Sequence, residues 1–198
     1  MIPLVIVGAG SAGRFYRQII DDINTDELTY EFVGFVDDTK TGPEIIGRIT
    51  DIPTACRVVL GVNWSRSRAL LAHRITTELE TLIHPTALIG RDVILGPGSV
   101  LGPNVTLGPN VELGQGTHLN VGVSVHQGTQ AGGWLTMGPG ARVCGDCTIG
   151  SHVEIGANAV IVNLHTVGDG ARIGACAAVV SDVARNITVG GVPARRLR

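Results

Sequence analysis

The spacing of apolar positions changes near residue 85, and this change divides the chain into two parts. In the first part, short apolar runs alternate with segments whose apolar residues recur at helical spacing. We expect buried strands over 3–7, 30–36 and 57–62, and helices over 11–23 and 65–79. Alternation of strands and helices is typical of a parallel sheet covered by helices. The first part, residues 1–82, is therefore predicted to be a small α/β domain of Rossmann-like type.

The starts and faces of these helices can also be read from the sequence. Ser11 follows a turn rich in glycine and is the expected N-cap of the first helix. The second helix is expected to bury one face, which carries Leu70, Leu71, Ile75 and Leu79.

The second part of the chain repeats with a period of six residues. An apolar residue recurs at every sixth position for sixteen steps, at Ile89, Leu95, Leu101, Leu107, Leu113, Leu119, Val125, Ala131, Met137, Val143, Ile149, Ile155, Ile161, Val167, Ile173 and Val179. Glycine follows most of these anchors directly, and a small or β-branched residue lies four positions after most of them. A period of six fits neither a helix nor a flat strand. It predicts a triangular parallel β-helix of about five coils, in which each hexad forms one short face and glycine relieves the corner.

Composition and charge narrow the class of protein. The chain has 15 Lys and Arg against 17 Asp and Glu, which argues against nucleic acid or an anionic membrane as its main partner. It has 28 glycines but only 4% aromatic residues, so its interior must be filled by small and branched aliphatic side chains. No apolar run approaches the length of a membrane span, and the N-terminus lacks a basic region before its apolar residues. We therefore expect a cytoplasmic protein with reduced thiols.

Several short motifs accompany the repeat, and together they carry a resemblance to a known family. They are GAGSAG at 8–13, FVDD at 35–38, LGVN at 60–63, IHPTA at 83–87 and VGGVPAR at 189–195. The repeat resembles that of the hexapeptide acyltransferases. The motifs, in this order, resemble the branch that contains nucleotide-amino-sugar N-acetyltransferases and sialic acid O-acetyltransferase-like proteins. Over essentially the whole chain, this resemblance implies a left-handed parallel β-helix at 83–198, a homotrimer, a nucleotide sugar bound by residues 1–82, and acetyl-CoA bound by the β-helix.

The resemblance implies a histidine that acts as general base on the acceptor. Matched position by position, this base is His126, with Asn120 nearby and Gln127 where the family commonly has Glu or Asp. A neutral imidazole suits removal of a proton from an attacking amine near pH 7, and direct attack on the thioester needs no covalent intermediate. Asn120 and His126 also replace two of the glycines that follow the apolar anchors. A polar side chain at such a corner is expected to point outward, toward a neighbouring subunit of the trimer.

The resemblance also implies which residues contact the two ligands. For the nucleotide sugar they are Gly10, Ser11 and Ala12 at the phosphate or sugar, Asp37 and Asp38 as acceptors for a base or ribose, and Gly61 and Asn63. For acetyl-CoA they are Ala157 and Ala175 along the later coils, Trp134 and Thr136 where the family often has a second histidine, and Arg195 with Arg196 for the phosphates. Acetyl-CoA is the expected co-substrate, and no metal is expected.

One glycine motif permits other interpretations. Gly8, Gly10 and Gly13 have the spacing of a dinucleotide fingerprint, which would indicate NAD. Residues 1–82 are short for a complete Rossmann domain, and the same glycines also suit a βα turn that binds nothing.

Two sets of metal-type residues permit other interpretations as well. Cys144 and Cys147 have the spacing of a zinc or redox pair, but the hexad register places one at a corner and the other in the interior. Several histidines of the β-helix could be compared with the zinc ligands of β-helical carbonic anhydrases. They are His118, His126, His152 and His165. They lack the close pair and distant third histidine of such a zinc site.

These patterns predict an acetyl-CoA-dependent acetyltransferase that modifies the amino group of a nucleotide-linked amino sugar. Transfer to a sugar hydroxyl is the first alternative. The second is a β-helix that binds a nucleotide sugar without catalysis, which Gln127 and the missing second histidine would allow. A donor other than acetyl-CoA also stays open.

Overall fold

The computed structural model describes residues 1–25 and 27–197, and the chain divides into two compact units, Met1–Pro85 and Thr86–Arg198. The first unit has a four-stranded sheet in the order β3-β2-β1-β4, and every pair in it is parallel. Its elements are β1 (Ile2–Val7), α1 (Ser11–Ile23), β2 (Tyr30–Val36), β3 (Ile45–Gly47), the 3-10 helix η1 (Ile49–Asp51), β4 (Arg57–Leu60), α2 (Ser65–Ala72) and β5 (Leu82–Ile83). The predicted α/β organisation is confirmed.

The sequence predicted the second helix of this unit wrongly. Helix α2 ends at Ala72, and the expected apolar face is not buried as a whole, since Leu70 is 68% exposed. The chain instead turns back to the sheet, where Leu79 forms a parallel bridge with Val58 of β4. Backbone hydrogen bonds to Val58 therefore replace the last turns that helical spacing predicted. Strand β4 also ends earlier than expected, at Leu60.

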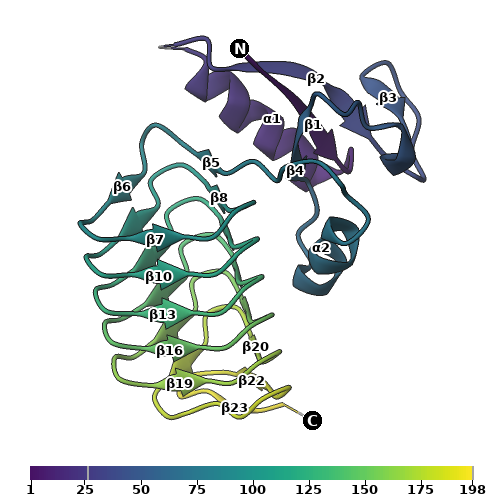
Figure 1. Cartoon of the computed structure of the whole chain (residues 1–198). Helices are drawn as coiled ribbons and strands as arrows, with labels where there is room; N and C mark the ends of the chain where they lie inside the picture. Colours follow the sequence, from purple (N-terminus) through teal and green to yellow (C-terminus); the bar gives the residue numbers. More distant parts are fainter. Residues whose placement is uncertain (26, 198) are drawn as a thin grey trace. The chain divides into compact units, whose positions relative to one another are not determined.

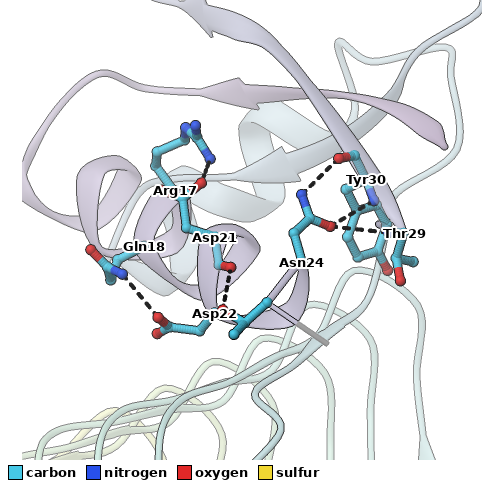
Figure 2. A network of polar contacts seen from close by, with 8 residues as sticks. Arg17, Gln18, Asp21, Asp22, Asn24, Thr29 and Tyr30 are labelled. Carbon is cyan, nitrogen blue, oxygen red and sulfur yellow. Dashed lines mark hydrogen bonds and ion pairs between the residues drawn. The ribbon is translucent and has the colours of Figure 1, made fainter. Parts of the chain in front are cut away.

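The ends of α1 differ from the expectation at one point. Gly10 is the N-cap residue, so Ser11 is the first residue inside the helix. At the other end, Asn24 ties the helix to the start of β2, as Figure 2 shows. Its side-chain nitrogen donates to the Tyr30 carbonyl at 2.8 Å, and its oxygen accepts from the backbone N–H groups of Thr29 and Tyr30 at 3.1 and 3.0 Å. These bonds fix the connection between helix and strand.

The second unit consists of two-residue strands, one in each hexad. They are β6 (Leu88–Ile89), β7 (Ile94–Leu95), β8 (Val100–Leu101), β9 (Thr106–Leu107), β10 (Glu112–Leu113), β11 (His118–Leu119), β12 (Ser124–Val125), β13 (Gln130–Ala131), β14 (Thr136–Met137), β15 (Arg142–Val143), β16 (Thr148–Ile149), β17 (Glu154–Ile155), β18 (Val160–Ile161), β19 (Thr166–Val167), β20 (Arg172–Ile173) and β21 (Ala178–Val179), followed by β22 (Thr188–Gly190) and β23 (Arg195–Arg196).

These short strands stack into three parallel columns, as Figure 1 shows for the teal to yellow part of the chain. The columns are β7-β10-β13-β16-β19, β6-β9-β12-β15-β18-β21 and β8-β11-β14-β17-β20-β22, and β23 closes the last one in antiparallel direction. Each strand of the repeat pairs with the strand three hexads further along, as His118 does with Thr136. The unit is therefore the parallel β-helix that the period of six predicted, and its left-handed sense is the one that the resemblance implied.

Two positions of each hexad fill the interior. Most anchors are buried, and so are the residues four positions later, such as Val105, Val111 and Val123, all 0% exposed. The first anchor, Ile89, is 42% exposed, and Ala131 is half-buried. A narrow interior of this kind has room for branched aliphatic side chains but not for many aromatic rings, which accounts for the composition.

The glycines that follow the anchors serve a different purpose from the one expected. Positive φ angles occur two residues later, for example at Asn104 and Asn110. A Cβ at Gly114 would lie 2.5 Å from the backbone nitrogen of Gly133 in the next coil. Glycine is therefore required because successive coils approach closely there, not because the corner needs a left-handed backbone.

Candidate functional sites

The first unit has a hollow at the carboxyl edge of its sheet, where open α/β sheets commonly bind ligands. It measures about 250 Å³ and is lined by residues at the ends of β1, β2 and β4, among them Gly8, Asp37 and Val62. A second hollow of about 400 Å³ shares Asp37 and extends along residues 38–42 and 45–48. The edge therefore offers a continuous concave surface for a ligand.

Three glycines bring the loops of this edge together. A Cβ at Gly13 would lie 1.9 Å from the carbonyl oxygen of Gly8, and one at Gly61 would lie 2.7 Å from the Cα of Gly13. The turn before α1 therefore packs directly against the end of β4. This contact accounts for the spacing of Gly8 and Gly13 without a dinucleotide.

Asp37 stabilises the same edge through four hydrogen bonds to its carboxylate. The backbone N–H of Ala9 donates to one oxygen at 2.9 Å, and the N–H and hydroxyl of Thr39 and the N–H of Lys40 donate to the other at 2.8–3.0 Å. Burial alone would raise the pKa of Asp37, but these bonds outweigh it and lower the pKa to about 2. The carboxylate stays charged and joins the β1 and β2 loops.

Asp38 is held in a similar way. It accepts a hydrogen bond from the backbone N–H of Ile49 at 3.1 Å and pairs with Arg74 at 2.9 Å, and these contacts lower its pKa. Both aspartates expected to contact a base or ribose therefore already have partners within the first unit.

The remaining residues expected at the nucleotide sugar lie along this edge, but they differ in exposure. Ser11 and Asn63 are exposed, whereas Ala12 and Gly61 are buried. Gly10 lies at the start of α1, where a Cβ on Gly10 would be in ordinary contact with the Lys40 Nζ, at 3.5 Å. The first turn of a helix leaves backbone N–H groups without intrahelical partners, so this corner presents donors and a cation. The structure thus brings these loops together. At the start of α1, the groups that a ligand could contact are mainly backbone atoms and the Ser11 side chain.

In the second unit, the two residues expected at the reaction centre lie at different corners. Asn120 follows β11, and its side-chain oxygen accepts a hydrogen bond from the N–H of Val121 at 2.7 Å. His126 follows β12, in the neighbouring column of strands, and is exposed. One hexad equals one face of the coil, so a single chain places these side chains at successive corners and does not bring them together.

The neighbours of these two residues follow the same columns. Gln127 is exposed and lies against the next coil, since a Cβ at Gly145 would be 2.5 Å from its Nε2. Ala157 and Ala175 follow β17 and β20, so they belong to the corner of Asn120 and not to that of His126.

The remaining positions expected at acetyl-CoA differ in their surroundings. Thr136 is half-buried on β14, whereas Trp134 is only 8% exposed and its ring fills the space beside Gly116. Arg195 and Arg196 are exposed and line a hollow of about 320 Å³ at the last coil. Trp134 is therefore more a packing residue than an open contact surface.

The residues considered for a metal are dispersed. Within 1–25 and 27–197, no group of three or more His, Cys, Asp or Glu side chains is arranged to hold a metal ion. Cys147 is buried and its thiol points to the carbonyl of Val162 at 3.3 Å, whereas Cys144 is half-buried. His165 contacts Asp182 at 3.2 Å. No helix in the described part of the chain is long and apolar enough to cross a membrane.

One buried residue at this edge was missed by the sequence reasoning. Arg68 in α2 is 0% exposed, and its guanidinium contacts the loop that follows β4. A signal was present, because Arg68 lies three residues after Ser65 and three before Leu71, on the inner stripe of a helix. An arginine in such a stripe is unusual unless its charge has a partner.

Known proteins share both the repeat and the fold. Residues 86–120 match the family model described as Bacterial transferase hexapeptide (six repeats). A segment of 54 residues is 50% identical to a chloramphenicol acetyltransferase of Agrobacterium fabrum, but it covers only 27% of this chain and 26% of that protein. The chain therefore spans about a quarter of that relative's length.

Solved structures match over the whole chain. The acetyltransferase domain of PglB from Neisseria gonorrhoeae has a TM-score of 0.92 at 27% identity, with 100% of both chains covered. The same domain in complex with acetyl coenzyme A has a TM-score of 0.92 at 26% identity and covers 98% of each chain. PerB from Caulobacter crescentus, in complex with CoA and GDP-perosamine, shares the fold with a TM-score of 0.89 at 22% identity, over 99% of this chain and 97% of that one.

Proposed function

We propose that this chain, which has a six-residue repeat and the fold of these acetyltransferase structures, transfers the acetyl group of acetyl-CoA to the amino group of a nucleotide-linked amino sugar. The likeness to the PglB acetyltransferase domain carries the proposal, since it spans 100% of both chains and that domain has been solved with acetyl coenzyme A. The likeness to PerB supports a nucleotide amino sugar as the acceptor class. The hollow beside Gly8 and Val62 is the proposed nucleotide-sugar site.

In the proposed reaction, His126 is the general base. The acceptor nitrogen attacks the thioester carbonyl carbon, the new C–N bond forms as the C–S bond breaks, and CoA leaves as its thiolate. The imidazole takes the proton that the attacking amine loses, which is work that a neutral histidine performs near pH 7. Exposure of His126 at a corner of the coil supports this role, because the side chain is accessible to a ligand held outside its own chain.

The proposed site needs two copies of the chain. Asn120, Ala157 and Ala175 share one corner, whereas His126 belongs to the next corner. A ligand can contact both corners where the Asn120 corner of one subunit faces the His126 corner of its neighbour. Repetition of this contact closes a ring. We therefore propose a homotrimer with acetyl-CoA between adjacent β-helices. We place the reaction in the cytoplasm, where the free cysteines found in the structure stay reduced.

The proposal is tested by thiol release from acetyl-CoA with UDP-, dTDP- and GDP-linked amino sugars as acceptors. We expect turnover on at least one amino sugar, and a loss of about 10²–10⁴-fold in kcat for His126→Ala, which removes the base. The exposed His73 provides the matched control, since His73→Ala leaves the β-helix intact. A product that carries the acetyl group only on a sugar hydroxyl would assign O-acetylation. Absence of turnover from folded protein, together with nucleotide-sugar binding, would favour a binding protein.

A further inference from the structure

The buried arginine of α2 has no part in the chemistry described above. Arg68 is 0% exposed and is the largest fully buried side chain among the described residues. A guanidinium cannot be deprotonated in proteins, so its charge is buried with it. An apolar side chain of similar size is often as stable or more stable in such a place. A buried arginine therefore needs a reason beyond stability.

The contacts of Arg68 point to the turn that connects β4 with α2. One terminal nitrogen of its guanidinium donates to the carbonyl of Val62 at 3.3 Å and to the carbonyl of Asn63. Its charge also acts on Tyr16 of α1: burial raises the pKa of that phenol to about 12, and Arg68 opposes the rise. Arg68 therefore holds two consecutive backbone carbonyls of one turn, those of Val62 and Asn63.

This turn forms part of the hollow at the carboxyl edge. Val62 lines the hollow together with Gly8. The two loops touch, because a Cβ on Gly8 would lie 3.0 Å from the Gly61 carbonyl and 3.1 Å from the Val62 side chain. Asn63, the next residue, is exposed. A shift of the Val62 and Asn63 carbonyls would therefore move a wall of the hollow and the Asn63 side chain.

We propose that Arg68 is a positioning residue that holds the Val62–Asn63 turn in the conformation that receives the nucleotide sugar. This inference rests on the proposed function, and it assigns Arg68 no contact with the substrate. A wall that is ordered before binding does not lose conformational freedom when the ligand arrives. A terminal guanidinium nitrogen suits the task, because its two N–H groups can reach neighbouring carbonyls at the same time.

The test compares Arg68→Met and Arg68→Lys with the unmodified protein by calorimetric titration with UDP, dTDP and GDP. We expect the nucleotide that the unmodified protein binds to bind about tenfold or more weakly to Arg68→Met, with partial recovery in Arg68→Lys. In turnover assays, KM for the nucleotide sugar should rise by a similar factor. Both kcat and the KM for acetyl-CoA should change by less than about twofold, because Arg68 acts only on the nucleotide-sugar site.

Arg57→Met is the matched control for a loss of stability alone. Arg57 lies on β4 of the same unit and pairs with Glu78 and Glu80 at 3.3 and 2.7 Å, away from the hollow-lining residues. We expect this variant to melt earlier but to bind the nucleotide normally. Equal nucleotide affinity in the unmodified protein and Arg68→Met would overturn the role of Arg68 and leave the proposed function standing. If Arg68→Met does not fold, unchanged affinity in Arg68→Lys has the same meaning. If the unmodified protein binds none of the three nucleotides, the proposed function fails, and this inference with it.

Discussion

At the scale of single residues, the corners of the β-helix select side chains that tolerate a left-handed backbone. Three positions after the anchors, φ is positive, and the residue is usually Gly, Asn or Asp, such as Asn110 and Asp146, both at 56°. Bulky side chains pay a steric penalty in this conformation. Leu164 has a φ of 65° and is 71% exposed, so little burial offsets its strain.

Replacement of Leu164 should therefore stabilise the β-helix. We expect Leu164→Asn to raise the free energy of unfolding by about 1 kcal/mol, because asparagine adopts the left-handed conformation at lower cost. Urea denaturation measures the change. The reverse substitution, Asn110→Leu at the corresponding corner position, should destabilise by a similar amount. Destabilisation by Leu164→Asn would contradict this account and would show that the exposed leucine makes a contact in the assembled protein.

The carboxylate of Asp37 makes the stability of the first unit dependent on acid. Its pKa is about 2 in the folded chain against an ordinary value of 3.8, so its contribution is complete above about pH 4 and is lost as the pH falls toward 2. We expect Asp37→Asn to lower the stability by about 1–2 kcal/mol at pH 7 through weaker hydrogen bonds. The difference between the two proteins in thermal unfolding should shrink between pH 4 and pH 2. A difference that stays constant over this range would show that the charge is irrelevant.

At the scale of elements, close backbone contacts decide where glycine is required. The start of α1 meets the end of β4 through Gly13, and a Cβ there would lie 1.9 Å from the Gly8 carbonyl oxygen. Gly10, three residues earlier, has space, since its nearest neighbour would be the Lys40 Nζ at 3.5 Å. The two glycines belong to one motif but carry different structural demands.

This difference is measurable by alanine substitution. We expect Gly13→Ala to destabilise the first unit by about 3 kcal/mol or more, because the backbone of Gly8 must move to admit the methyl group. Gly10→Ala should change the stability by less than about 1 kcal/mol. Chemical denaturation followed by circular dichroism compares the two variants. Equal effects would mean that the glycines serve the turn conformation and not the packing.

At the scale of the whole molecule, the two proposed ligands fall in different parts of the sequence. Residues 1–85 contain the hollow at the sheet edge, and residues 86–198 contain His126 and the coil corners. Each part has its own core, because the anchors of the β-helix form one continuous apolar cluster within the second unit. A ligand that binds only one folded unit stabilises that unit by mass action.

Hydrogen exchange should therefore separate the two ligands. We expect a bound nucleoside diphosphate to slow amide exchange mainly within residues 1–85. Bound CoA should slow amide exchange within residues 86–197. At a ligand concentration of about 100 Kd, the stabilisation approaches roughly 2.7 kcal/mol. Protection by CoA confined to residues 1–85 would contradict the assignment of ligands to units.

The amino-acid sequence by itself determined the β-helix. Each coil repeats the same contacts, so the same apolar position recurs every six residues and the pattern is visible without any knowledge of distant contacts. Strand β2 and helix α1 were also predicted with their observed bounds, since each has a clear periodicity of its own. For the site, the sequence singled out His126 as a polar residue at a corner where glycine prevails, and the structure leaves this side chain exposed.

Only the tertiary structure decided the features that depend on contacts between distant residues. Pairing of Leu79 with Val58 ended α2 early, and the closeness of successive coils explained the glycines after the anchors. Asp37 acquired its role from the backbone N–H of Ala9, which lies 28 residues earlier in the sequence. Local spacing shows which face a residue occupies, but it does not show what lies opposite, and the partner determines what a buried or charged group does.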